Sequence, residues 1–275
     1  MRGGNQVELD LCTEILQCPR DARKLLGNIV DKKFEEVVWT PEMVDRYWAF
    51  VAEKSENYFT YQVSDCIIAR FRNELRSCEA VADYGAGPGY LVESLLAINK
   101  QCAAIEFSQS GVDALKRKFE GHRSFLGAWP INQTESLLAK FEAVFLTEVV
   151  EHLYDAELAK CLGTIRNILA PRGFLLLTTP NDEDRSLQFI MSPETGHVFH
   201  RWQHVRSWTA DSLSRTIGAN GFNVVHVEAM DFATHLSAFR RSDSLPLRLT
   251  RSAFRRARIL AGFKAPNLCL VARKA

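Results

Sequence analysis

The stretch that decides the fold reads Val81-Ala82-Asp83-Tyr84-Gly85-Ala86-Gly87-Pro88-Gly89-Tyr90-Leu91. Its apolar start predicts a short strand, its glycines predict a tight turn, and the residues after Gly89 predict a helix. Glycine lets a backbone approach a ligand closely, and the first turn of a helix offers free N–H groups. We therefore expect this turn to bind a ligand.

The spacing of the glycines and the acids around them exclude a dinucleotide. In the dinucleotide motif G-x-G-x-x-G the third glycine comes later, whereas here Tyr90 stands at that position. Asp83 would repel a pyrophosphate but suits a ligand with an ammonium group. Glu106 follows Asp83 by 23 residues, where a carboxylate can accept hydrogen bonds from both ribose hydroxyls of a nucleoside. S-adenosylmethionine is cationic, lacks phosphates and meets both conditions.

Outward from this turn, short apolar runs alternate with helical periods along most of the chain. Strands are predicted at residues 80–84, 102–107, 123–127, 141–147, 173–179, 222–228 and 267–273. Such alternation indicates the α/β class, in which helices cover both faces of a mostly parallel, doubly wound sheet. A helix is predicted from Asp155 to Leu169, where a proline and a glycine end it.

The first 62 residues predict a helical N-terminal cap, and residues 63–275 the α/β domain with an insert at 231–266. Thr40 and Pro41 are typical of a helix start, and a second helix is predicted from Ser64 to about Leu75.

Composition is that of a soluble globular protein, with 47% hydrophobic residues, 24% charged residues and a net charge of +1. The sequence has no apolar run near the roughly 18 residues of a membrane-spanning helix and no signal-peptide pattern, so we expect a cytoplasmic protein. The seven cysteines are odd in number and form no CxxC pair, which argues against a disulfide framework or a zinc ribbon.

The insert contains a basic stretch, residues 240–264, with eight basic residues and one acid. Its arginines recur at helical spacing and could bind a phosphate-bearing substrate, a nucleic acid or, peripherally, an anionic lipid surface. A solvated helix face over an apolar stripe docked on the sheet explains the pattern equally well. The nearly neutral overall charge disfavours nucleic acid without excluding it.

From residue 57 to 274 the sequence resembles class I (Rossmann-like) methyltransferases. Asp83-x-Gly85-x-Gly87-x-Gly89 is similar to their first motif, Glu106 to the acid after their second strand, and 147–181 to their fourth and fifth strands. The resemblance implies a seven-stranded sheet whose last strand is antiparallel, with S-adenosylmethionine as methyl donor. The expected cofactor-binding residues are Asp83, Gly85, Ala86, Gly87, Gly89, Glu106, Phe107, Ala128, Trp129 and Thr147.

Two details of that resemblance concern parts outside the first motif. Gly127-Ala128-Trp129-Pro130 occupies the third-strand turn, where the family carries an acid that faces the adenine, so contacts to adenine are assigned to Ala128 and Trp129. Tyr58 and Phe59 stand where family members often cover the cofactor and the acceptor. For the neighbouring Trp48 a place in a hydrophobic core under the cap is at least as good an explanation.

An acid-rich turn follows the predicted fourth strand. If it is helical, Glu148, Glu151 and His152 lie on one side of it at the sheet edge where ligands bind. With His204, from a histidine-rich segment before a helix capped by Thr209, they could hold Mg²⁺ or another divalent metal. This arrangement is similar to that of ubiquinone-pathway O-methyltransferases and small-RNA 2′-O-methyltransferases, which implies a metal that acidifies the acceptor hydroxyl.

Without a metal, His152 or His204 is the best general base, and the expected catalytic residues are His152, His204 and Glu148. The leading hypothesis is methyl transfer to oxygen on a small-molecule, glycan or lipid-linked acceptor, with nitrogen and carbon left open. The alternatives are a metal-dependent RNA 2′-O-methyltransferase and, from another class, a non-catalytic S-adenosylmethionine-binding or scaffold protein.

Overall fold

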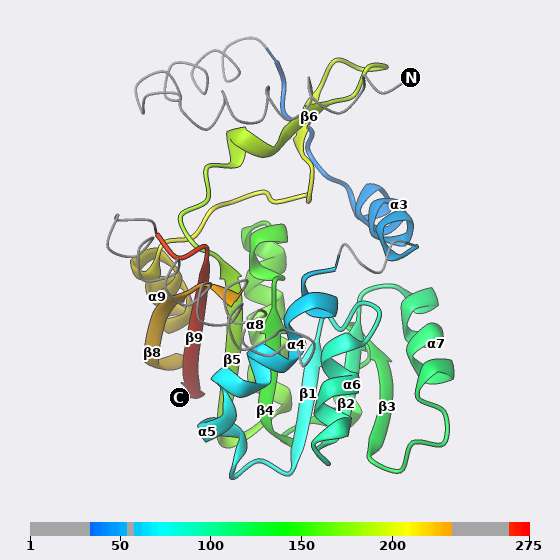
Figure 1. Ribbon diagram of the computed structural model, residues 1–275, viewed down its shortest axis with the longest axis vertical. Helices are drawn as coiled ribbons and strands as arrows, with labels where there is room; N and C mark the ends of the chain where they lie inside the picture. Colours follow the sequence, from blue (N-terminus) through cyan, green and yellow to red (C-terminus); the bar gives the residue numbers. More distant parts are fainter. Residues whose placement is uncertain (1–33, 54–57, 233–263) are drawn as a thin grey trace, which may run out of the picture. The chain divides into compact units, whose positions relative to one another are not determined.

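The structure is a computed structural model that describes residues 34–53, 58–232 and 264–275 (Figure 1). Contacts divide the chain into two compact units, and each is considered by itself. The described part of the smaller unit is 34–39 and 184–204, and the larger unit takes the rest. This grouping differs from the expected boundary at residue 62, because the helices between residues 40 and 70 belong to the larger unit.

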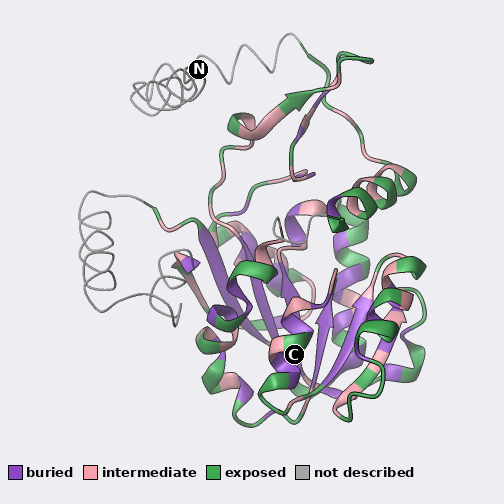
Figure 2. Cartoon of the chain, turned by 45° about the vertical axis from the view of Figure 1, so that its right-hand side comes forward, coloured by how far each residue is buried: buried purple, intermediate pink, exposed green. Residues whose placement is uncertain are grey.

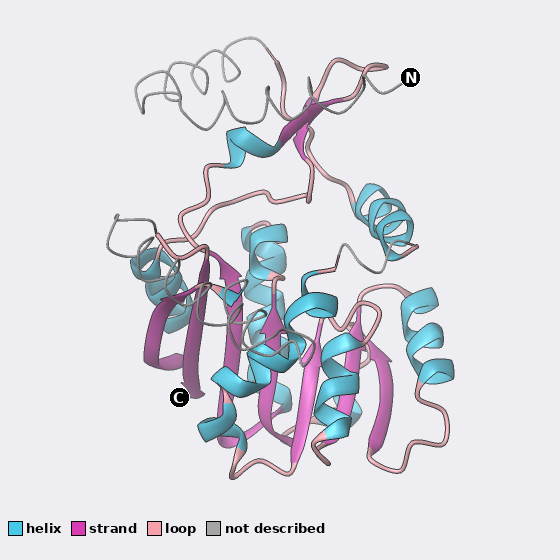
Figure 3. Cartoon of the chain, in the orientation of Figure 1, coloured by secondary structure: helices cyan, strands magenta, loops and turns pink. Residues whose placement is uncertain are grey.

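The larger unit is built on one seven-stranded sheet with the order β3-β2-β1-β4-β5-β9-β8 (Figure 3). The strands are β1 (Ala80–Tyr84), β2 (Gln101–Glu106), β3 (Phe125–Pro130), β4 (Phe141–Thr147), β5 (Leu169–Pro180), β8 (Phe222–Met230) and β9 (Asn267–Lys274). The last strand, β9, is antiparallel to both β5 and β8, between which it lies. The predicted α/β fold with an antiparallel last strand is confirmed.

Helices cover both faces of the sheet and create two hydrophobic cores. One core contains α4 (Phe59–Arg70), α5 (Arg72–Leu75), α6 (Tyr90–Ala97) and α7 (Gln109–Lys118), and the other contains α8 (Asp155–Ile168) and α9 (Ala210–Ala219). Along β4, Phe145 faces the first core and the next residue, Leu146, faces the second. Figure 2 shows the resulting layer of buried strands between helices that are exposed on their outer sides. A strand buried on both faces needs apolar residues throughout, which explains the continuous apolar runs of the sequence.

Two predicted helix starts are confirmed. The Thr40 hydroxyl caps α3 (Pro41–Ala52) by accepting a hydrogen bond from the Met43 N–H. Thr209 and Ser212 form a reciprocal capping box at the start of α9. Each cap satisfies N–H groups that the first helical turn leaves free.

Other boundaries differ from the sequence prediction. β3 begins at Phe125 and continues to Pro130, so Ala128 and Trp129 lie in the strand, not in the turn after it. The Pro-Arg-Gly segment that ends the predicted helix lies within β5, where Arg172 has a positive φ of 61° and the register to β4 shifts. The expected single helix from Ser64 is two helices, α4 and α5, and starts earlier, at Phe59.

The smaller unit contains a β-hairpin that the sequence did not predict. Its strands are β6 (Phe189–Met191) and β7 (Val198–His200). The Val37 N–H donates to the Val198 carbonyl, and the ring of Trp39 packs edge-on against Phe199 at 5.7 Å.

The basic stretch 240–264 lies outside the described residues except for Lys264, and most of the predicted insert 231–266 does too. None of the helices that the structure describes is both long and apolar enough to span a membrane.

Candidate active site

The glycine turn between β1 and α6 requires glycine for two separate reasons. Gly85, Gly87 and Gly89 all have positive φ, at 81°, 51° and 80°, where side chains are strained. Each is also covered: an added Cβ would lie 2.7 Å from Val149 at Gly85, 3.1 Å from the Tyr58 ring at Gly87, and 2.6 Å from Leu115 at Gly89. The backbone of the turn therefore packs so closely against neighbouring side chains that little room is left for a Cβ at these three positions.

Glu106, the last residue of β2, is hydrogen-bonded to the backbone of this turn. Its carboxylate accepts hydrogen bonds from the Gly87 N–H at 2.7 Å and from the Phe107 N–H at 2.8 Å. Burial raises its pKa, and these backbone hydrogen bonds partly oppose the rise. Gly111 in α7 leaves room for the Glu106 side chain, since an added Cβ would lie 2.8 Å from its Cγ. A carboxylate has about four acceptor sites, so Glu106 keeps capacity for ribose hydroxyls.

Asp83 lies in β1, beside the glycine turn, with only 2% of its surface exposed. Burial, followed by the charge of Glu106, raises its pKa to about 7. A buried acid of this kind is stabilised as a carboxylate by a nearby cation. The site therefore fits a ligand with a positively charged group.

The other predicted cofactor residues are distributed around this edge of the sheet. Ala86 is buried in the turn, and Phe107, next to Glu106, is half exposed. The Thr147 hydroxyl, at the end of β4, is buried without a hydrogen-bond partner among the described residues. Ala128 packs into the core with α7, whereas Trp129 belongs to the opposite face of β3. The two residues assigned to adenine thus point to different faces.

The acid-rich turn after β4 is not the single helical face that the sequence suggested. A short 3₁₀ helix, η3, spans only Val150–His152, and Glu148 precedes it with a left-handed φ of 51°. Glu151 and His152 therefore lie in a short helix that Glu148 does not join, so the condition for placing all three on one helical side is not met. Instead both acids reach the end of β5: the Glu148 carboxyl interacts with the Thr178 side chain, and Glu151 accepts a hydrogen bond from the Thr179 hydroxyl at 2.8 Å.

These two carboxyl groups strongly influence each other. Burial raises the pKa of Glu148, and the nearby charge of Glu183 raises it further. Burial also raises the pKa of Glu151 well above its ordinary value, and the charges of Glu148 and Glu183 add to the rise. Val149, between the two acids, touches the position of Gly85, so this acidic turn borders the glycine turn directly.

Of the four predicted metal ligands, two lie side by side in the larger unit. His152 Nε2 is 3.9 Å from Glu151 Oε1, whereas Glu148 is directed to Thr178. His204 belongs to the smaller unit, where its ring stacks on His200 at 4.2 Å. Two side chains from one turn do not complete the six-fold coordination of Mg²⁺. The metal site remains a prediction.

An aromatic cluster borders both turns. The Tyr58 ring covers Gly87 and lies 6.0 Å from Trp48 and 6.4 Å from Tyr90. Burial and the charge of Glu106 raise the pKa of Tyr58. Trp48, in α3, also packs edge-on against His152 at 5.0 Å. The sequence predicted that Tyr58 covers the cofactor site, but it did not predict the contact between Trp48 and His152. These two residues are about a hundred positions apart, and no local pattern links them.

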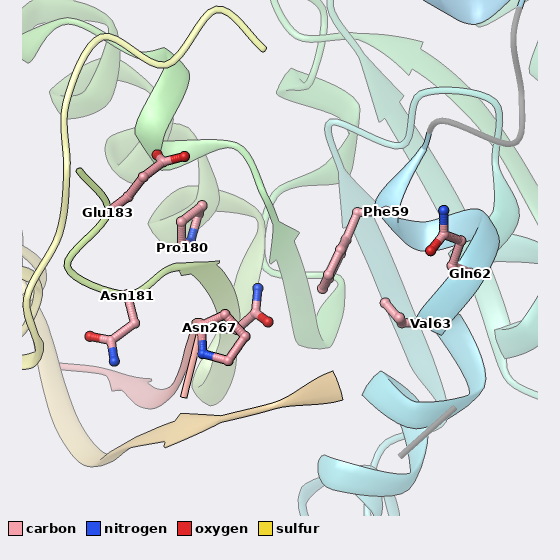
Figure 4. A pocket seen from close by; sticks show the side chains of 8 residues that line it. Phe59, Gln62, Val63, Pro180, Asn181, Glu183 and Asn267 are labelled. Atoms are coloured by element: carbon pink, nitrogen blue, oxygen red, sulfur yellow. The ribbon is translucent and has the colours of Figure 1, made fainter. Parts of the chain in front are cut away.

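A cavity of about 430 Å³ lies within the larger unit (Figure 4). Phe59 and Val63 of α4 face Pro180 and Asn267 across it. Its lining consists of Phe59, Gln62, Val63, Pro180, Asn181, Glu183, Pro266 and Asn267. Tyr58 covers the glycine turn and the next residue, Phe59, lines the cavity, so one end of α4 borders both.

Comparison with known proteins gives a consistent result. A family model described as a methyltransferase domain matches residues 57–227, more than half of the chain. A 1,6-didemethyltoxoflavin-N1-methyltransferase from Burkholderia thailandensis has a similar structure, with a TM-score of 0.57, 13% identity, and coverage of 88% of this chain and 93% of that one. A SAM-dependent methyltransferase from Archaeoglobus fulgidus gives a TM-score of 0.53 and 16% identity over 83% of this chain and 100% of that one. The search of curated proteins gives no match.

At such low identities the structural likeness establishes the fold alone, and the family model establishes the family. The chain belongs to the methyltransferase domain family and has the class I strand order, with an acid at the end of β2 and a glycine turn after β1. It is an S-adenosylmethionine-dependent methyltransferase.

Proposed function

We propose that this methyltransferase transfers the methyl group to a hydroxyl oxygen of a small-molecule acceptor. The observation that carries the proposal is the close pair of His152 and Glu151, which lies in the turn that packs against the glycine turn. A cavity of about 430 Å³ nearby is of a size that suits a small molecule. The Burkholderia neighbour was solved with the small molecule 1,6-didemethyltoxoflavin bound, which supports this acceptor class.

The donor side of the reaction follows from residues that fit the cofactor. When bound, S-adenosylmethionine supplies a methyl group on a sulfonium, which is already a strong electrophile. Glu106 would accept hydrogen bonds from the ribose, and Asp83 would face the positively charged part of the ligand. The glycine turn allows close approach of the backbone, and Tyr58 closes the turn from the α4 side.

On the acceptor side, the chain must position a hydroxyl and take its proton. As the C–O bond forms and the C–S bond breaks, the hydroxyl proton passes to the imidazole of His152. Trp48 packs edge-on against the His152 ring and Glu151 lies 3.9 Å from its Nε2, and we expect both contacts to orient the imidazole. Orientation of this kind accounts for much of the rate enhancement in group transfer.

The proposal is tested by measuring S-adenosylhomocysteine formation with matched alcohol and amine acceptors. We expect turnover with hydroxyl compounds, and His152→Ala should lower kcat by about 10²–10⁴-fold, the usual contribution of a general base. Binding of S-adenosylhomocysteine, measured by calorimetry, should stay unchanged in this variant. Turnover with amines alone, or full activity of His152→Ala, would refute oxygen transfer with this base.

The metal alternative is decided in the same assay. If His152 acts as the base without a metal, EDTA leaves the rate unchanged. If EDTA abolishes turnover and Mg²⁺ restores it, Glu151 and His152 are ligands instead, and the metal acidifies the hydroxyl.

Three further alternatives from the sequence have weaker support. RNA as acceptor is suggested by the resemblance of Glu148, Glu151, His152 and His204 to small-RNA 2′-O-methyltransferases, and salt-sensitive RNA binding would favour it. The basic stretch, which could also contact a lipid surface, lies outside the described residues except for Lys264. Glycan and lipid-linked acceptors remain within the oxygen proposal and belong in the acceptor panel. A non-catalytic scaffold would bind S-adenosylmethionine without turning over any acceptor.

A further inference from the structure

The start of β9 places a carboxamide on an apolar face of the sheet. Side chains alternate along a strand, so Asn267 lies on the same face as Cys269 and Val271, which belong to the core beneath α4. All three are buried, and Asn267 itself is 8% exposed. Asparagine is depleted in strands, and the apolar pattern of β9 gives no local reason for it at this position.

The three amides that line the cavity differ in their partners. The Asn181 Nδ2 donates a hydrogen bond to the Ala265 carbonyl at 2.8 Å, which ties the end of β5 to the segment before β9. Gln62 has a partner of its own, as does the acid Glu183. The Asn267 amide forms no hydrogen bond with the part of the chain that the structure describes. Its donor and its acceptor are therefore both available to a ligand.

The Asn267 amide is also directed into the cavity. Figure 4 shows it pointing toward Phe59, whereas the Asn181 amide points away. The wall opposite Asn267 is apolar and consists of Phe59 and Val63 of α4. The Phe59 ring packs edge-on against the buried Phe232 at 5.7 Å, which fixes this wall. A ligand between the two walls would contact apolar groups on one side and a carboxamide on the other.

A carboxamide selects its ligand by hydrogen-bond geometry, since it carries no net charge. It presents a carbonyl acceptor and an N–H donor side by side. The best partner offers the same two functions in the opposite order, as primary amides, lactams and the edges of some heterocycles do. A ligand that offers only one of them leaves a buried polar group unpaired, which is unfavourable.

We propose that this cavity binds an uncharged, flat ligand with an amide-type edge, and that Asn267 binds this edge through a pair of hydrogen bonds. Phe59 and Val63 provide the apolar contacts for the ring of the ligand, as aromatic and aliphatic walls do in small-molecule sites. The inference rests on the proposed function only in making this ligand the methyl acceptor. The binding itself does not depend on which atom is methylated.

Benzamide and acetophenone test the need for the amide edge. They share a ring and a carbonyl group, and an NH₂ group in one replaces a CH₃ group in the other. Affinities are measured by ligand-observed NMR titration with the protein saturated with S-adenosylhomocysteine, which keeps the probes out of the donor site. Benzamide should bind at least about fivefold more tightly, the effect of one net hydrogen bond. Acetophenone is the more apolar probe, so equal affinities, or a preference for acetophenone, would overturn the proposal.

Replacing Asn267 locates the effect. Asn267→Leu keeps the approximate side-chain size and should abolish the preference for benzamide. Its Tm should not fall, because the lost amide has no partner among the described residues; a clear fall would show a structural role and contradict the inference. Asn223→Leu, at an exposed position of β8, is the matched control and should keep the preference. A preference retained in Asn267→Leu would refute the site.

A second variant should produce a gain of binding. Asn267→Asp has nearly the same shape but replaces the N–H donor with an acceptor. It should therefore favour benzamidine, whose amidinium offers only donors, and raise the affinity for benzamidine relative to benzamide by about tenfold. An unchanged ratio would mean that the probes do not contact residue 267, and the proposal would be wrong.

The two proposals fail in different ways. If hydroxyl compounds are methylated through His152 but benzamide and acetophenone bind equally, only this inference is wrong. If benzamide is preferred and Asn267→Leu abolishes the preference while no hydroxyl compound is methylated, oxygen transfer is wrong and the binding site stands.

Discussion

At the scale of single residues, the candidate donor site contains Asp83, a buried acid beside the glycine turn. Burial and Glu106 raise its pKa to about 7, so without a ligand it is about half protonated at neutral pH and mostly protonated below it. A cationic ligand favours the ionised form, and binding then releases a proton. Glu148 is a second buried acid with a raised pKa. Its backbone has a positive φ, and its carboxyl interacts with Thr178 of β5.

Asp83 predicts a pH dependence with a definite sign. Because its folded pKa lies above its ordinary value of 3.8, its contribution to stability is present at low pH and is lost as pH rises to about 7. Asp83→Asn should remove this loss, which is at most about 4 kcal/mol. Chemical unfolding from about pH 4 to about pH 8 measures it. Parallel curves for the two proteins would contradict the raised pKa.

The same group links ligand binding to protons. Affinity for S-adenosylmethionine should rise between about pH 5 and about pH 8 as Asp83 ionises, with about one proton released near the lower end. Calorimetric titration in two buffers of different ionisation enthalpy counts the proton. Asp83→Asn should bind more weakly and show a flat profile; a steep profile in this variant would assign the proton elsewhere.

Glycine replacements give a matched pair. Gly89→Ala forces a side chain into a positive-φ residue with Leu115 at 2.6 Å, and should destabilise the protein by more than about 1 kcal/mol. Gly218→Ala, in α9 with open space around its Cβ position, should stabilise it by about 0.5–1 kcal/mol. Thermal unfolding compares them, and equal effects would mean that the turn adapts freely.

At the scale of elements, α3 and the start of α4 add aromatic side chains to the candidate donor site, beside β1 and the glycine turn. Tyr58 at the start of α4 covers Gly87, and Trp48 of α3 links Tyr58 to His152. Aromatic contacts of this kind contribute about 0.5–1.5 kcal/mol each beyond buried area. α3 is therefore a positioning element for the histidine of the acceptor side.

Replacing Trp48 tests that role. Trp48→Leu loses the ring contacts with Tyr58 and His152 and should lower kcat about tenfold, with a smaller change in the stability of the fold. Phe50→Leu on the same helix, at a side chain that is 58% exposed, is the control and should retain full activity. If both variants behave alike, α3 contributes only general packing.

At the scale of the whole molecule, the residues of the candidate donor site lie in the larger unit, at the carboxyl edge of β1, β2 and β4. Open parallel sheets bind ligands at this edge because the helix starts and loop side chains meet there. The smaller unit adds a hairpin and the stacked pair His200 and His204.

Cofactor binding should therefore stabilise the protein as a ligand of the native state. S-adenosylhomocysteine at about 100 times its Kd should add about 2.7 kcal/mol, seen as a rise in Tm by differential scanning fluorimetry. NAD should give no rise, because a buried carboxylate beside the glycine turn would repel a pyrophosphate. Glu106→Ala should weaken the effect strongly; an equal rise with NAD would contradict the reading of the first motif.

The sequence by itself determined the sheet, the glycine turn and the acid at the end of β2. These features are local: apolar runs predict β4, and closely spaced glycines after a strand predict the turn. The structure adds the reason for glycine at Gly85 and Gly89, which have positive φ and are packed against Val149 and Leu115. The helix starts at Thr40 and Thr209 were equally readable, because a cap involves neighbours within a few residues.

Only the tertiary structure gave the surroundings of the residues that we propose for the acceptor side. It placed Glu148 outside the η3 turn, put Trp48 against His152, and joined α4 to the ends of β5 and β9 in one cavity. Such contacts link residues distant in sequence and depend on packing and backbone strain, which leave no periodic signal. Sequence patterns record how each element forms, whereas the acceptor site arises where separate elements meet.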